Sequence, residues 1–139
     1  MTAGALTVTV PATADLGSGT PSTTISGSLG NVTVSDLRGA NPAPWTASVT
    51  STDFTATGVT AIPASAVTYT PGTATTVGDG TFTAGTAGAL GTTPLTAYTH
   101  TGGTGSNSAT WDPTLAVAVP ATATATTYSG TVTHSVTGT

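Results

Sequence analysis

The chain has 139 residues, and we expect it to form one domain, residues 1–139, around a single core. Arg38 is the only cation and five aspartates are the only anions, so the formal net charge is −4. One arginine cannot neutralise a run of phosphates, which excludes nucleic acid and an anionic membrane surface as partners. The chain has no cysteine, so disulfides and cysteine metal sites are excluded.

The composition predicts an all-β fold. The chain has 38 threonines and no Glu, Lys or Gln. Threonine and valine favour strands, and 18 glycines and 9 prolines interrupt the chain too often for long helices. We expect a two-sheet antiparallel β-sandwich, immunoglobulin-like, with about eight or nine strands.

Apolar and polar residues alternate with the period of a strand from one end of the chain to the other. In chain order, strands are expected around residues 6–10, 32–34, 45–49, 67–69, 81–83, 95–99, 111–119 and 128–136. Residues 71–108 are less regular, and long loops are expected there. Within them, residues 102–105 (GGTG) are expected to form a flexible turn.

The two ends of the chain resemble each other. Residues 6–14 (LTVTVPATA) and 115–123 (LAVAVPATA) are identical at seven of nine positions. In both segments a proline, Pro11 or Pro120, stops a strand because proline cannot donate to the ladder. We expect the two strands to occupy related places, with Leu and Val facing inward.

Two segments carry a resemblance to a known family: residues 32–49 (VTVSDLRGANPAPWTASV) and 127–136 (TYSGTVTHSV). Together they resemble the WxL domain of bacterial surface proteins, as a divergent member. The family pattern is matched by Asp36, Arg38, Gly39 and Trp45 in the first segment and by Thr127, Tyr128 and Val132 in the second. An Asp-Phe pair at residues 53–54 and the run 64–69 also fit this pattern.

The sequence departs from the WxL signature at three positions. Ala47 stands in place of the first Leu, His134 in place of the second Trp, and Val136 in place of the second Leu. The resemblance implies an extracellular location at a bacterial cell surface and non-covalent attachment to the cell wall, with peptidoglycan or an associated glycan as the partner. Residues 1–4 (MTAG) do not resemble a signal peptide, so we expect that the signal of an exported protein is missing from this sequence.

Four residues are candidates for ligand binding: Trp45, Asp36, Arg38 and Trp111. An exposed indole could stack on a sugar ring, yet each Trp begins an alternating apolar series, which favours a place in the core. Asp36 and Arg38 could form a ligand-binding pair. A structural ion pair that fixes the proline-rich loop at residues 40–44 is the favoured interpretation.

The remaining polar residues do not indicate catalysis or a cofactor. His134 has the parity of an apolar face, whereas His100 is expected in a loop. Two histidines without a ligand spacing and five scattered aspartates indicate neither a zinc nor a calcium site. No catalytic residues, metal or cofactor are predicted, and the chain is not expected to be an enzyme.

Three functions remain as hypotheses. The first is a cell-surface module that binds wall glycan. The alternative is a structural subunit of a surface layer, fibre or appendage, in which copies or other surface proteins join by β-strand addition. The third, ice binding by threonine arrays, requires a regular Thr-x-Thr repeat, and the pairs Thr7-x-Thr9 and Thr131-x-Thr133 do not continue at a fixed period.

Overall fold

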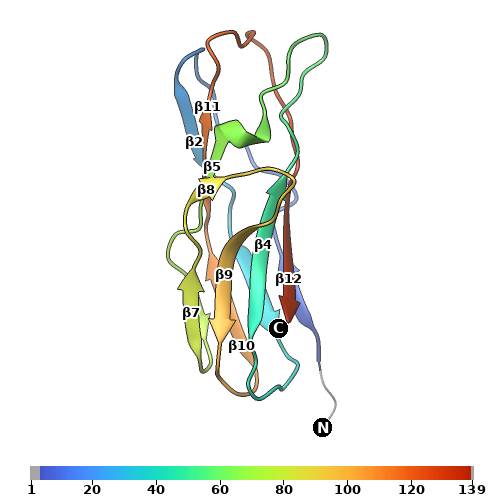
Figure 1. Cartoon of the computed structure of the whole chain (residues 1–139), viewed down its shortest axis with the longest axis vertical. Helices are drawn as coiled ribbons and strands as arrows, with labels where there is room; N and C mark the ends of the chain where they lie inside the picture. The colour runs from blue at the N-terminus through green and yellow to red at the C-terminus, as the bar shows by residue number, and fades with distance from the viewer. Residues whose placement is uncertain (1–3, 139) are drawn as a thin grey trace.

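The computed structural model describes residues 4–138, and within this range it contains twelve β-strands and one short 3-10 helix, Ala64–Ala66 (Figure 1). The all-β prediction is confirmed. The sequence predicted about eight or nine strands. The structure has more because proline and glycine divide the predicted runs into shorter strands. The run 111–119, for example, is divided at Asp112 and Pro113 into β10 (Asn107–Trp111) and β11 (Thr114–Ala118).

The strands form three antiparallel sheets of four strands each. Sheet A has the order β1 (Leu6–Thr9), β3 (Val32–Asp36), β10 and β6 (Thr75–Val77). Sheet B has the order β2 (Thr24–Ser28), β11, β5 (Val67–Thr70) and β8 (Gly88–Ala89). Sheet C has the order β12 (Val132–Gly138), β4 (Trp45–Ser51), β9 (Leu95–Thr101) and β7 (Thr81–Ala84).

Several segments of the chain contribute one strand to sheet A and the next strand to sheet B, or the reverse. Four connections link the two sheets: a long one through residues 10–23 and three short ones through residues 29–31, 71–74 and 112–113. Gly30 has a φ of 84°, and Pro71 and Pro113 have no amide hydrogen to donate, so the ladders break at these points. Figure 1 shows β2, β5 and β11 in the upper half of the molecule and β10 in the lower half.

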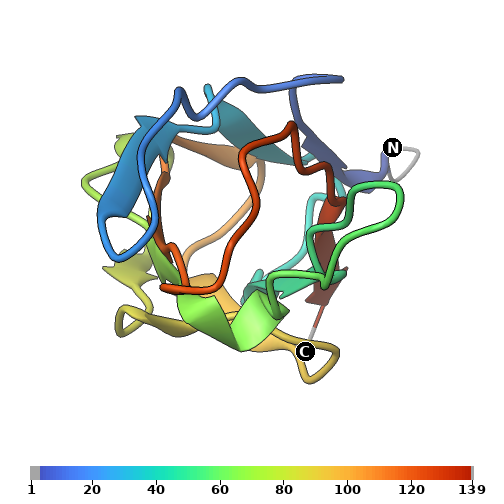
Figure 2. The same cartoon turned by 90° about the horizontal axis from the view of Figure 1, so that it is seen from above.

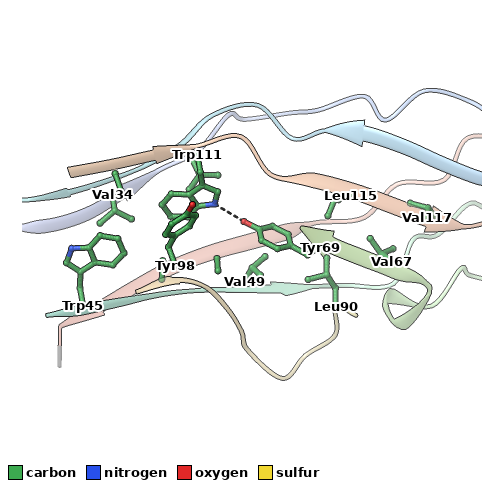
Figure 3. Packing of buried hydrophobic residues seen from close by; sticks show 14 of the residues in the cluster. Val34, Trp45, Val49, Val67, Tyr69, Leu90, Tyr98, Trp111, Leu115 and Val117 are labelled. Carbon is green, nitrogen blue, oxygen red and sulfur yellow. Dashed lines mark hydrogen bonds between the residues drawn. The ribbon is translucent and has the colours of Figure 1, made fainter. Parts of the chain in front are cut away.

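The core lies between the inner faces of the sheets. Alternate residues are buried on most central strands, including Val32 and Val34 on β3 and Ala47 and Val49 on β4. On β9 a register shift breaks this alternation, and the consecutive residues Ala97 and Tyr98 are both buried. Figure 2 shows the N-terminal strands, in blue, on one side of the core and the yellow segment that leads into β9 on the other. The rings of Tyr98 on β9 and Trp111 on β10 pack across this core with centroids 4.7 Å apart (Figure 3).

The middle of the chain is more regular than predicted. Residues 71–108 contain β6, β7, β8, β9 and the start of β10 instead of long loops. The strands expected around residues 81–83 and 95–99 are confirmed as β7 and β9. The turn expected at residues 102–105 is also confirmed, since Gly102, Gly103 and Gly105 have φ values of 68°, 71° and 73° and connect β9 to β10.

The two similar end segments do not occupy equivalent places. β1 is an edge strand of sheet A, whereas β11 lies in the middle of sheet B between β2 and β5. The expected side-chain directions are confirmed at four positions: Leu115 and Val117 are buried, and Leu6 and Val8 pack against the same core with partial burial. The inward direction expected for Val10 is wrong, because β1 ends at Thr9 and Val10 is 46% exposed. The similarity therefore sets which face points inward, but the neighbouring strands set the position in the sheet.

None of the helical segments in residues 4–138 has the length and apolar character required to cross a membrane.

Candidate functional site

Asp36 and Arg38 form the ion pair that the sequence favoured. The Asp36 carboxylate accepts hydrogen bonds from Arg38 Nε at 2.9 Å, Arg38 Nη2 at 2.8 Å and the Arg38 backbone amide at 3.0 Å. Arg38 Nη2 also donates to the Pro44 carbonyl at 2.9 Å, so the guanidinium ties the loop before β4 to the end of β3. Asp36 is fully buried and the Arg38 side chain is 24% exposed.

Asn107 connects this ion pair to Trp45. Its amide nitrogen donates to Asp36 Oδ2 at 3.2 Å, and its amide oxygen accepts from Trp45 Nε1 at 2.8 Å. Hydrogen bonds from the Arg38 side chain hold the pKa of Asp36 below its usual value, against the opposing effect of burial. Arg38, Asp36, Asn107 and Trp45 thus form one satisfied polar chain at the end of the core.

His100 lies in the core beside this chain, and its expected place in a loop is wrong. It is part of β9, is 1% exposed, and stacks on Trp45 with centroids 5.8 Å apart. Its Nδ1 lies 2.6 Å from the Ala43 carbonyl oxygen and its Nε2 lies 2.7 Å from the Asp79 carbonyl oxygen. Both ring nitrogens therefore face backbone carbonyl oxygens.

A second polar chain crosses the core from Trp111 to His134. Trp111 Nε1 donates to Tyr69 Oη at 3.0 Å (Figure 3), and Tyr69 Oη lies 2.8 Å from His134 Nε2. Burial raises the pKa of Tyr69 to about 12 and lowers the pKa of His134 to about 4. The tyrosine is therefore the donor to a neutral imidazole at neutral pH. The prediction that His134 faces the apolar side of its strand is confirmed.

The four candidate binding residues serve the interior of the domain. Trp45 is 0% exposed and Trp111 is 1% exposed, so neither indole offers a face to a sugar ring. The core interpretation of both indoles is confirmed. Asp36, Arg38 and Trp45 are brought together, whereas Trp111 belongs to the second chain.

Sequence reasoning missed Asn107, Tyr69 and the buried place of His100. A signal for Asn107 was available, because it has the same parity as Ala109 and Trp111 and therefore faces the core on β10. No such signal linked Tyr69 to Trp111, since their contact joins strands from two different sheets.

Two open hollows lie side by side near the end of β4. One, of about 380 Å³, follows the end of β4 and is lined by Thr52, Asp53, Thr55, Ser129, Gly130 and Thr131. A neighbouring hollow of about 470 Å³ shares Thr52 and Asp53 and extends to Leu90 and Thr92. Asp53 Oδ1 accepts the Ala64 amide at 2.9 Å, which anchors the 3-10 helix beside them.

Within residues 4–138, no three His, Cys, Asp or Glu side chains gather as metal ligands would. In comparisons with known proteins, no protein-family model, curated protein or solved structure matches the chain.

Proposed function

We propose that this chain is a non-catalytic structural domain of a bacterial cell surface, in which copies join by β-strand addition. In this proposal the fold is an immunoglobulin-like sandwich, with sheets A and B as one layer and sheet C as the other. The WxL resemblance supports the extracellular location. The chemistry of the sheet edges supports the mode of assembly.

The observation that carries the proposal is the composition of the six edge strands. The edges of the three sheets are β1, β6, β2, β8, β12 and β7, and none of them contains a charged residue or a proline. Edge strands expose unpaired amides and carbonyls, and folded proteins normally protect them with lysine, proline or an inward charge. Unprotected edges of this kind accept a strand from another chain.

The edge at β6 is the candidate acceptor in this proposal. All three residues of β6 are exposed, and Val77 is 66% exposed. On the opposite side of the molecule, β1 lies beside β12, where a Cβ on Gly138 would be 3.8 Å from the Leu6 side chain. That side is therefore covered by the chain itself, and β6 remains accessible.

Sedimentation velocity over a series of protein concentrations tests this assembly. We expect the full chain to form larger species as concentration rises, and Val77→Lys to shift it towards monomer because a charge on the edge must be desolvated on pairing. Thr122→Lys places the same charge in an exposed loop and serves as the control. A chain that stays monomeric at every concentration contradicts the proposal.

Attachment to wall glycan is the second candidate, and the hollow beside Asp53 favours it. Three threonines, a serine and a carboxylate line this hollow, which suits the hydroxyl groups of a neutral sugar. Co-sedimentation with peptidoglycan sacculi tests it. We expect Thr55→Lys, which fills the hollow, to reduce binding, whereas Thr122→Lys leaves it unchanged. Equal binding by both variants rules out this hollow as the glycan site.

A further inference from the structure

Two of the six edge strands, β1 and β12, lie near the ends of the chain, and they are held very differently. β12 has seven residues paired to β4, and its His134 contacts Tyr69 Oη. The segment before β12 is also bonded to the chain after β4, through the backbone of Ser129 and Thr131. β1 has four residues and pairs only with β3, and residues 6–9 form no side-chain hydrogen bond in the part of the chain that the structure describes. Of the two terminal strands, β1 is therefore the more weakly held.

The connection from β1 to β2, residues 10–23, can release β1 without breaking another strand pair. Figure 2 shows it, in blue, along the outside of the molecule. Within the described range, residues 10–21 make no backbone hydrogen bond to any other segment, and all of them are exposed except Leu16, which packs against the core. Pro11 follows β1 closely and favours extended backbone at the start of the connection. Its fourteen residues span roughly 46–50 Å when fully extended, which is far enough to carry β1 to a neighbouring copy.

The place that β1 occupies must be refilled when β1 leaves. Leu6 and Val8 pack against the core, and backbone hydrogen bonds extend the pairing with β3 to Gly4 and Ala5, both of which bond to Leu37. Release of this segment exposes apolar core surface and the unpaired edge of β3. The same segment of a second copy fits this place in the same register, so it restores every contact that was lost.

We propose that copies of this chain exchange β1, so that β1 of one copy pairs with β3 of another in the register that it has within one chain. This inference rests on the proposed self-association and names a donor strand for it. The acceptor is β3, at the opposite side of sheet A from β6. Because each copy both donates and accepts β1, the exchange closes as a pair or continues as a chain of copies.

Single-cysteine variants test the exchange, because the chain has no cysteine of its own. Thr7 on β1 pairs with Ser35 on β3, and paired residues of antiparallel strands have Cα atoms about 4.5–5.5 Å apart, within the range of a disulfide. Thr7→Cys and Ser35→Cys are made in separate chains, so neither chain can form a disulfide within itself. A disulfide between them reports that β1 of one copy lies on β3 of the other, and a C-terminal tag on one chain identifies this mixed dimer on a non-reducing gel.

The two chains are mixed at high concentration, with and without a brief step in mild urea that loosens β1, and are then oxidised. We expect the mixed dimer in several-fold excess over the dimer from Thr7→Cys with Thr122→Cys, a control cysteine in an exposed loop. Thr9→Cys with Thr33→Cys, the next outward pair in the register, repeats the test. Thermal unfolding verifies that each variant is folded. Mixed dimers no more abundant than the control, for both register pairs, overturn the exchange.

A locked chain separates the exchange from pairing at β6. In the double variant Thr7→Cys/Ser35→Cys, oxidation of the monomer ties β1 to its own β3, and we expect the exchanged species to disappear from sedimentation velocity and to return on reduction. Val77→Lys is expected to retain the exchanged species, because β6 takes no part in it. Assembly that depends on concentration but gives no excess of mixed dimer overturns the exchange and leaves strand addition at β6 in place. A chain that neither assembles nor gives mixed dimers contradicts both proposals.

Discussion

Acidification is expected to destabilise the fold through His134. Its Nε2 lies 2.8 Å from Tyr69 Oη, which already accepts a hydrogen bond from Trp111 Nε1. A neutral imidazole accepts the tyrosine proton and completes the chain. A protonated imidazole presents an N–H to that hydroxyl and leaves the tyrosine proton without its acceptor.

The magnitude follows from the pKa of His134, which burial lowers from 6.5 to about 4. The unfolded chain therefore takes up a proton first, so stability is complete above pH 6.5 and is lost as the pH falls from there to about 4. The full difference between the two pKa values of His134 corresponds to a loss of at most about 3 kcal/mol in the free energy of unfolding. Partial solvent exposure of the side chain reduces the expected loss to about 1–2 kcal/mol.

Urea denaturation at about pH 7 and about pH 4.5 measures this loss as a change in the free energy of unfolding. His134→Gln keeps an acceptor for Tyr69 but cannot titrate, and we expect its stability to depend less on pH. Asp36 does not interfere, because its pKa is lowered from 3.8 and its contribution is lost only at lower pH. The same pH dependence in wild type and His134→Gln would refute the role of His134.

Three further predictions concern the core and the chain ends. Trp45→Ala is expected to lower the free energy of unfolding by about 3–5 kcal/mol in urea titrations, because it empties a fully buried site; a loss below about 1 kcal/mol contradicts this packing. Arg38→Met is expected to speed amide exchange in residues 40–44 before the sheets unfold, and unchanged exchange there means that Arg38 does not hold the loop. Deletion of residues 1–10 removes β1, with the partly buried Leu6 and Val8, and is expected to cost about 2–4 kcal/mol. A synthetic peptide of residues 1–10 is expected to restore that stability, and a truncated chain as stable as the wild type rules out a structural role for β1.

Local pattern predicted which residues face the core. The parity of Trp45 with Ala47 and Val49 placed that indole inside, and all three are buried. The short spacing of Asp36 and Arg38 likewise predicted an ion pair, since two residues apart at the end of a strand can close a local hydrogen-bonded ring.

Features that depend on strand register could not be predicted in this way. His100 was expected in a loop because glycine and threonine surround it, yet β9 continues to Thr101 and turns it inward. A row of four threonines crosses sheet C, and long-range strand pairing sets its alignment. The row consists of Thr137, Thr46, Thr99 and Thr83. A search along the sequence for Thr-x-Thr repeats does not find it, because the repeat runs across the strands.

Acrylamide quenching of tryptophan fluorescence, with and without peptidoglycan sacculi, tests the central claim most directly. That claim is that the two tryptophans and the ion pair of Asp36 and Arg38 serve the core, while the outer surfaces and edges of the sheets carry the function. We predict that both indoles, Trp45 and Trp111, are protected in the native chain and that sacculi do not alter their quenching. Efficient quenching of the native protein, or protection that appears only when sacculi are added, would contradict the account.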